Sequence, residues 1–288
     1  MRNHQINGEC YLCKNKNLKL RHPRVRDNKD LSVLECMDCG LVFLESFSHI
    51  SDEFYEESGM LDGKVNLSIY RKKSYKDDLR RCEDLRDKMI GKTILDFGCG
   101  AGGFLNLMKQ YADKCVGIEL DNTIRNSLNE EGIICFKSTK EIKDKFDFIT
   151  LFHVVEHLTD PIETLKELRE YLNPNGVIII EVPNADDALL TLYNCEEFKD
   201  FTYWSCHTIL YNSATLKLLL NKSGYSNITV KQFQRYPLSN HLYWLSQGMP
   251  GGHNIYSLLN NQLLEKNYEG VLASLGKCDT IIAEIMIN

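Results

Sequence analysis

From residue 92 onward the chain alternates short apolar runs with segments of helical periodicity. Runs of strand length, rich in β-branched residues, occupy 93–98, 115–120, 133–136, 146–152, 176–183 and 227–233. Segments in which apolar residues recur at helical spacing occupy 103–112, 122–132, 161–172 and 213–224. Near-continuous apolar strands separated by helices predict a parallel sheet that is covered on both faces. The pattern therefore predicts the α/β fold class.

Two further segments stand outside this alternation. Residues 67–89 combine helical charge pairing with the absence of Gly and Pro, and they lead into the first strand. Residues 236–277 have helical spacing, many aromatics and a GMPGG turn, and a last apolar run follows at 280–287. A long insertion at a site-bearing edge is often a lid or a substrate-recognition element. The alternative is a contact within a homodimer.

Four cysteines near the start of the chain form a metal-binding pattern. Cys10 and Cys13 make one C-x-x-C pair, and Cys36 and Cys39 make a second pair after a gap of 22 residues. Zn²⁺ prefers sulfur ligands, and four thiolates form a closed structural site. Gly40 directly follows the second pair and suits the tight turn of such a knuckle. The pattern predicts a structural zinc ion; the alternative is four unrelated buried cysteines.

These features divide the chain into three parts. A module of about 45 residues buries too little surface to be stable alone, so a bound metal would supply folding energy. We expect a zinc ribbon at 1–48, a helical linker that caps the cofactor at 49–91, and a large domain at 92–288. The insertion at 236–277 belongs to the large domain.

Composition narrows the partners and the compartment. The 288 residues carry a formal net charge of −6, which disfavours a general nucleic-acid binder, because nucleic acids are held by excess Lys and Arg. No run of eighteen apolar residues predicts membrane insertion, and the first residues lack an apolar signal segment. We therefore expect a cytoplasmic protein, in which eleven cysteines do not form a disulfide framework.

A glycine-rich turn ends the first strand of the large domain, in the stretch ILDFGCGAGGF. Its glycines are Gly98, Gly100, Gly102 and Gly103. Glu119 ends the second strand, 19 residues after Gly100, a spacing at which an acid binds both ribose hydroxyls of a nucleotide-like cofactor. NAD, FAD and S-adenosylmethionine (SAM) all fit this arrangement.

Asp96 distinguishes these cofactors. It lies two residues before the first glycine, where its carboxylate would repel the pyrophosphate of a dinucleotide. SAM has no phosphate and carries an ammonium and a sulfonium group. Charge-assisted hydrogen bonds are roughly twice as strong as neutral ones, so the carboxylate favours SAM.

Residues 92–235 resemble the class I SAM-dependent methyltransferases. The matching stretches, in the family's order, are ILDFGCGAGGF, VGIEL, FDFITLFHVVEHLTDP, LNPNGVIIIEVPN and HTILYNSATLKLLLNKSGY. The resemblance implies a Rossmann-like sheet of seven strands, whose last strand is antiparallel and lies between the fifth and sixth. A cysteine module before such a domain is similar to methyltransferases of bacterial sugar and surface-polysaccharide biosynthesis. Sugar C-methyltransferases are also similar, but they have a longer C-terminal part.

The resemblance also implies the cofactor-binding residues. Asp96 and the glycines Gly98, Gly100 and Gly102 would bind the methionine part of SAM, and Glu119 would bind its ribose. Leu120 would contact the adenine; the resemblance also places Ser138 and Thr139 near the adenine, on a weaker match. Phe152 and His153 would contribute to the cofactor wall.

The function that follows is O-methylation of a sugar, a nucleotide-sugar or a related small precursor. A hydroxyl is a poor nucleophile until its proton is removed, and His is the commonest general base. His207 lies among Tyr203, Trp204 and Tyr211; it is either a base or acceptor ligand, or a packed structural residue. The pair Glu156–His157 either transfers a proton or shapes the cofactor pocket.

Two other functions stay open. One is an RNA methyltransferase that holds nucleic acid with its zinc ribbon, which the net acidity disfavours. The other is a non-catalytic SAM-binding protein whose ribbon docks a partner.

Overall fold

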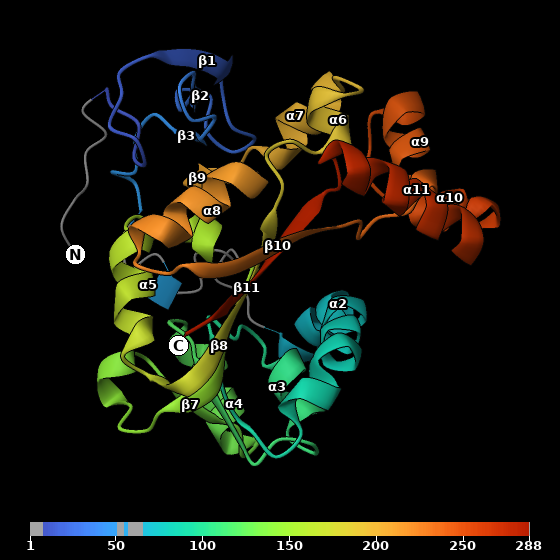
Figure 1. Cartoon of the computed structure of the whole chain (residues 1–288). Coiled ribbons are helices and arrows are strands. Elements are labelled where there is room, and N and C mark those ends of the chain that lie inside the picture. The colour runs from blue at the N-terminus through green and yellow to red at the C-terminus, as the bar shows by residue number, and fades with distance from the viewer. Residues whose placement is uncertain (1–7, 51–54, 57–65, 288) are drawn as a thin grey trace.

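The computed structural model describes residues 8–50, 55–56 and 66–287, so most of the linker before residue 66 lies outside the described residues. The large domain contains the strands β4 (Thr93–Phe97), β5 (Lys114–Ile118), β6 (Ile134–Phe136), β7 (Phe146–Phe152), β8 (Leu172–Pro183), β10 (Asn227–Phe233) and β11 (Thr280–Met286). They form one sheet of order β10-β11-β8-β7-β4-β5-β6. Figure 1 labels β7, β8, β10 and β11 of this sheet. Five neighbouring strands, β8, β7, β4, β5 and β6, run parallel to one another. Strand β11 pairs antiparallel with both β8 and β10. The predicted α/β class and the place of the last strand are confirmed.

Helices cover both faces of this sheet (Figure 1). They are α2 (Leu67–Met89), α3 (Gly103–Met108), α4 (Asn122–Glu130), α5 (Pro161–Arg169) and α8 (Ser213–Lys222). Helices α2, α3 and α4 share a core with Ile94 of β4, whereas α5 and α8 share a core with the neighbouring Leu95. This follows from the two-residue period of a strand, which sends successive side chains to opposite faces. The helix predicted at 67–89 has the bounds of α2, whereas α3 is shorter than predicted.

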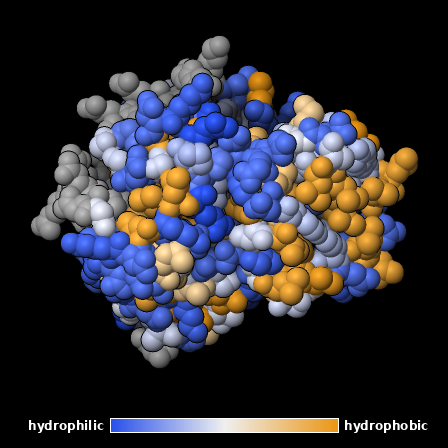
Figure 2. Space-filling view, turned by 90° about the horizontal axis from the view of Figure 1, so that it is seen from above, coloured by the Kyte–Doolittle hydropathy of each residue, from blue (hydrophilic) through white to orange (hydrophobic). Residues whose placement is uncertain are grey.

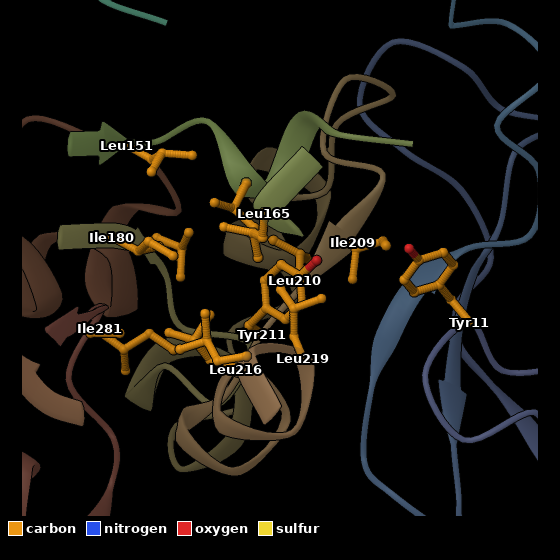
Figure 3. Packing of buried hydrophobic residues seen from close by; sticks show 14 of the residues in the cluster. Tyr11, Leu151, Leu165, Ile180, Ile209, Leu210, Tyr211, Leu216, Leu219 and Ile281 are labelled. Atoms are coloured by element: carbon orange, nitrogen blue, oxygen red, sulfur yellow. The ribbon is translucent and has the colours of Figure 1, made fainter. Parts of the chain in front are cut away.

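The cysteine module forms a second sheet that includes a strand of the large domain. Its strands are β1 (Leu18–His22), β2 (Val33–Cys36), β3 (Val42–Leu44) and β9 (Ile209–Leu210), in this order. Strand β9 pairs antiparallel with β3, with Val42 opposite Leu210 and Phe43 opposite Ile209. Figure 3 shows Tyr11 of the module beside Ile209, from which buried side chains continue towards the main sheet. The module and the large domain therefore share one core.

The insertion before β11 is helical, as predicted. It contains α9 (Leu238–Gln247), α10 (Gly252–Ile255) and α11 (Gln262–Leu275), and it lies near α6 (Ala188–Thr191) and α7 (Glu196–Thr202). Trp244 of α9 is only 3% exposed and packs against Phe198 and Phe201 of α7, so it is a core residue.

The outer side of the insertion carries many exposed apolar side chains, which gather at the right of Figure 2. They include Leu242, Leu245, Met249, Ile255, Leu258, Leu263 and Leu275. No helix among the described residues is both long and apolar enough to cross a bilayer.

A buried carboxylate joins α2 to the sheet. Glu181 of β8 is 1% exposed and accepts hydrogen bonds from Arg80 Nη2 at 2.8 Å and from Arg81 Nη2 at 2.6 Å. Burial alone would raise the pKa of Glu181, but hydrogen bonds from His153 and Arg81 outweigh it and hold the pKa far below its usual range. The side chain is therefore ionised, and it depends on its cationic partners.

We expect Glu181→Gln to lower the free energy of unfolding by about 3–5 kcal/mol, because it leaves buried guanidinium groups without their carboxylate. Glu284→Gln is the matched control: Glu284 of β11 also binds α2, through Lys88 Nζ at 2.7 Å, but both side chains are partly exposed. Its loss should cost about 0–1 kcal/mol. Urea denaturation measures both values, and similar losses for the two variants would contradict the role of Glu181.

Candidate functional site

The chain turns sharply after β4, through the predicted glycine turn. Gly98 has a φ of +76°, and a Cβ atom there would lie 2.6 Å from Val154 Cγ2. Only glycine fits both constraints. The Gly98 and Cys99 N–H groups donate to the Ile118 carbonyl at 2.8 and 2.9 Å, which ties the turn to the end of β5. The turn is thus held between β5 and the segment that follows β7.

A cavity of about 210 Å³ opens at this turn. Its lining residues are Tyr70, Ser74, Asp78, Arg81, Asp96, Gly98, Cys99, Gly100, Ala101, Gly103, Phe104 and Phe152. Four of the predicted cofactor residues are among them: Asp96, Gly98, Gly100 and Phe152. Helix α2 contributes to the cavity lining, and it lies so close to the turn that a Cβ at Gly103 would clash with the Asp78 carboxylate.

Helix α2 contributes four lining residues that the sequence analysis did not name. Tyr70, Ser74, Asp78 and Arg81 are spaced by four, four and three positions, so they lie on one face of a helix. This run of polar and aromatic residues at helical spacing is the signal that would have identified them. The expectation that the linker caps the cofactor stays a prediction.

Three carboxylates surround the turn. Asp96 is 3% exposed and accepts a hydrogen bond from Thr150 Oγ1 at 2.7 Å; burial nevertheless raises its pKa to about 7. Burial also raises the pKa values of Asp78 and Glu119, and Glu119 Oε2 accepts the Gly100 N–H at 2.9 Å. Arg81 supplies one positive charge. Such a site favours a cation over a phosphate, because a nearby cation stabilises the charged carboxylates.

Other predicted cofactor residues lie outside the cavity lining. Gly102 immediately precedes α3. The Leu120 carbonyl accepts a hydrogen bond from Arg125. Ser138 accepts the Lys140 N–H and so caps a short 3-10 helix, and Thr139 of that helix is bonded to Glu167. The assignment of Leu120, Ser138 and Thr139 to the adenine stays a prediction.

The predicted catalytic residues meet in a second cluster. Glu156 and His157 lie in the 3-10 helix Val155–His157 after β7, and His207 lies just before β9. One potential ligand atom from each residue lies within 4.8 Å of the others. The His157 and His207 ring centroids are 5.0 Å apart, and the Trp204 ring packs against both.

The protonation of this cluster follows from its contacts. His157 Nδ1 lies 2.8 Å from the Cys206 carbonyl, which only accepts, so Nδ1 carries the hydrogen and Nε2 the lone pair. Burial lowers the pKa of His157, and it lowers that of His207 to about 3. Burial alone would raise the pKa of Glu156, but the hydrogen bond from His153 outweighs it and lowers the pKa. The cluster therefore holds an ionised carboxylate and two neutral imidazoles at neutral pH.

His153 links this cluster to the buried carboxylate of β8. Its Nδ1 lies 3.2 Å from Glu156 Oε1, and its Nε2 lies 3.4 Å from Glu181 Oε1 and 3.2 Å from Arg235 Nη1. Burial and the Arg235 charge lower the pKa of His153, but the two carboxylates outweigh them and raise it. His153 lies outside the cavity lining, so its predicted place in the cofactor wall stays untested.

The cysteine module supports the segment that carries His207. Asp27 accepts hydrogen bonds from the Ser205 N–H at 3.0 Å and from the Ser205 hydroxyl at 2.6 Å. The Arg26 guanidinium lies 4.3 Å from the centroid of the Trp204 ring. The Leu44 N–H donates to the Thr208 carbonyl at 3.0 Å.

The four cysteines of the module converge. Cys10 Sγ lies 3.5 Å from Cys39 Sγ, and Cys13 Sγ lies 3.4 Å from Cys36 Sγ. All four sulfur atoms lie within 4.8 Å of one another. Sulfur ligands about 2.3 Å from a shared tetrahedral ion have separations of this order. The residues present fit a structural zinc ion.

Comparison with known proteins identifies related domains. A family profile described as a methyltransferase domain matches residues 68–230. A ubiquinone biosynthesis O-methyltransferase of Histophilus somni is 29% identical over 156 residues, which make up 49% of this chain and 63% of that protein. A tRNA U34 carboxymethyltransferase of Campylobacter concisus is 30% identical over 110 residues, 34% of this chain and 38% of that protein. The chain thus spans less than two thirds of either relative.

Solved structures share the fold. A SAM-dependent methyltransferase from Archaeoglobus fulgidus superimposes with a TM-score of 0.52 at 19% identity, over 77% of this chain and all of that one (100%). A phosphoethanolamine N-methyltransferase of Haemonchus contortus in complex with SAM gives a TM-score of 0.51 at 13% identity, over 85% of this chain and 62% of that one.

We expect Glu119→Ala to weaken SAM binding by about 10–100-fold, since hydrogen bonds to a charged group are worth about 1.5–3 kcal/mol each. Glu130→Ala removes an exposed carboxylate at the end of α4 and is the control. Isothermal titration calorimetry measures the dissociation constants. A change of less than about threefold for Glu119→Ala would show that its carboxylate does not bind the cofactor.

Proposed function

Because a methyltransferase-domain profile matches more than half of it, the chain belongs to this family of SAM-dependent enzymes, and we propose that it methylates a hydroxyl of a sugar, a nucleotide-sugar or a related precursor. The observation that carries the proposal is the cluster of Glu156, His157 and His207 beside Trp204. Glu156 and His157 of this cluster follow β7 within a few residues. Val154, which lies between β7 and Glu156, packs against Gly98 of the glycine turn.

The residues around the turn fit SAM, which supplies an electrophilic methyl group on a sulfonium. Asp96 and Asp78 would attract its cationic groups, and Glu119 would accept hydrogen bonds from its ribose. Arg81 lines the same cavity and would pair with its carboxylate. The pyrophosphate of a dinucleotide would instead meet carboxylates, which disfavour it.

The Trp204 ring, which packs against His157 and His207, would suit a sugar ring as its partner. An aromatic face packs well against the apolar face of a sugar, while neighbouring polar atoms bind its hydroxyls. The free nitrogen of His157 and the ionised Glu156 would accept such hydrogen bonds and orient the acceptor oxygen. Positioning alone can supply about 7–11 kcal/mol of the barrier reduction. The low pKa of His207 makes it a weak proton acceptor. We therefore assign activation of the acceptor hydroxyl to the cluster as a whole.

We further propose that Cys10, Cys13, Cys36 and Cys39 hold a structural zinc ion. The ion would stabilise the module whose strand β3 pairs with β9. Since His207 lies just before β9, the module would act as a support for the acceptor side of the site.

Incubation with labelled SAM and separate pools of sugar nucleotides, phenolic quinone precursors and total tRNA tests the acceptor class. We expect label in the sugar pool, and its loss in Glu156→Gln and His207→Ala with SAM affinity retained. Lys266→Ala, on the insertion, is the control. Label only in tRNA would overturn the proposal in favour of RNA methylation, and label in no pool would favour a binding role.

The zinc proposal predicts metal content and stability together. Reduced, freshly purified protein should contain one tightly bound zinc per chain, and Cys39→Ser should lose it and unfold at a lower temperature, because the metal contributes to folding. Cys115→Ser, on β5, should keep the zinc. Elemental analysis and thermal denaturation measure these outcomes, and wild-type protein free of zinc at full stability would contradict the site.

A further inference from the structure

The cluster of Glu156, His157 and His207 contains buried polar atoms whose partners are missing. Glu156 is 0% exposed, and its Oε2 has no hydrogen-bond partner among the described residues. The same holds for His207 Nδ1, which is also buried. A buried polar atom without a partner costs about 1–3 kcal/mol, so native proteins rarely leave two together.

The other atoms of the cluster are already engaged with outer partners. Glu156 Oε1 lies 3.2 Å from His153 Nδ1, which leaves Oε2 free. His157 Nδ1 donates to the Cys206 carbonyl at 2.8 Å, which leaves the Nε2 lone pair free. Metal-binding histidines and carboxylates show this arrangement, because an outer hydrogen bond fixes the tautomer and orients the ligand atom.

We propose that Glu156, His157 and His207 bind a divalent transition-metal ion, distinct from the ion of the four cysteines. Two imidazole nitrogens and one carboxylate oxygen are a ligand set for Zn²⁺, Co²⁺ or Mn²⁺. Bonds of about 2.0–2.2 Å to a shared ion place ligand atoms roughly 3–4 Å apart. The three atoms lie within 4.8 Å of one another, so small side-chain shifts complete the site.

A cation satisfies this cluster better than a water molecule does. The ionised carboxylate and the neutral imidazole nitrogens all present lone pairs, and one water has only two hydrogens to donate to them. A divalent ion accepts all three lone pairs and also compensates the buried charge of Glu156.

The ion would keep open coordination positions for an oxygen of the acceptor, as metal sites with three protein ligands do. This role rests on the proposed function, whereas the binding of the ion does not. The site would then orient the acceptor hydroxyl through the metal, and His157 and His207 would serve as ligands.

Titration with Co²⁺ of protein that holds one zinc per chain, at the four cysteines, tests the site without SAM or an acceptor. We expect calorimetry to show one additional Co²⁺ per chain, with weak visible absorption and without the intense thiolate bands that exchange at the cysteines would give. Glu156→Gln and His207→Ala should each weaken binding by more than the roughly 10–100-fold that changes to outer partners cost. His253→Ala, in the insertion, is the matched control and should bind normally.

Thermal denaturation guards against misfolded variants. Co²⁺ should raise the unfolding temperature of the wild-type protein and leave that of Glu156→Gln unchanged. The proposal is overturned if this one additional Co²⁺ does not bind at millimolar concentration, or if its binding is unchanged in both Glu156→Gln and His207→Ala. Methyl transfer to sugars without a second metal would remove only the role of the ion in orienting the acceptor, and it would leave both the binding of the ion and the proposed function standing.

Discussion

The structure depends on a concentration of negative charge at one backbone turn. Asp78, Asp96 and Glu119 reach this turn from α2, β4 and the end of β5, and burial raises the pKa of each. Carboxylates so placed are only partly compensated by Arg81, and they are stabilised when a cation binds. Carboxylates from three separate elements therefore make the turn more favourable for a positively charged ligand than for a phosphate. The sulfonium and ammonium groups of SAM meet that requirement.

Two parts of the chain outside the seven-stranded sheet, α2 and the cysteine module, lie next to the candidate site. Helix α2 lines the cavity, and Glu181 holds this helix through Arg80 and Arg81. Near the proposed acceptor site, β3 of the cysteine module pairs with β9 next to His207. His153 lies between the two regions and contacts both Glu156 and Glu181. The cavity at the glycine turn and the proposed acceptor cluster are therefore joined by one buried polar network.

Sequence periodicity predicted the elements whose signal is local. The apolar runs of β7 and β10 and the helical pattern of α2 have the predicted bounds, because each regular pattern continues for seven residues or more. Strand β9 was not predicted, since two residues show no alternation, and its partner β3 lies far away in the sequence. The sequence also indicated the candidate catalytic residues. It did not predict that they lie close together, because His207 approaches Glu156 only through tertiary packing.

The most direct test of the cationic-ligand account is calorimetry of SAM and of nicotinamide and flavin dinucleotides at several pH values. Asp96 has a pKa of about 7 without ligand, and SAM should prefer its ionised form. We therefore expect SAM to bind more tightly at pH 7.5 than at pH 5.5 with release of protons, and the dinucleotides not to bind. Dinucleotide binding, or SAM affinity that rises as the pH falls, would contradict the account.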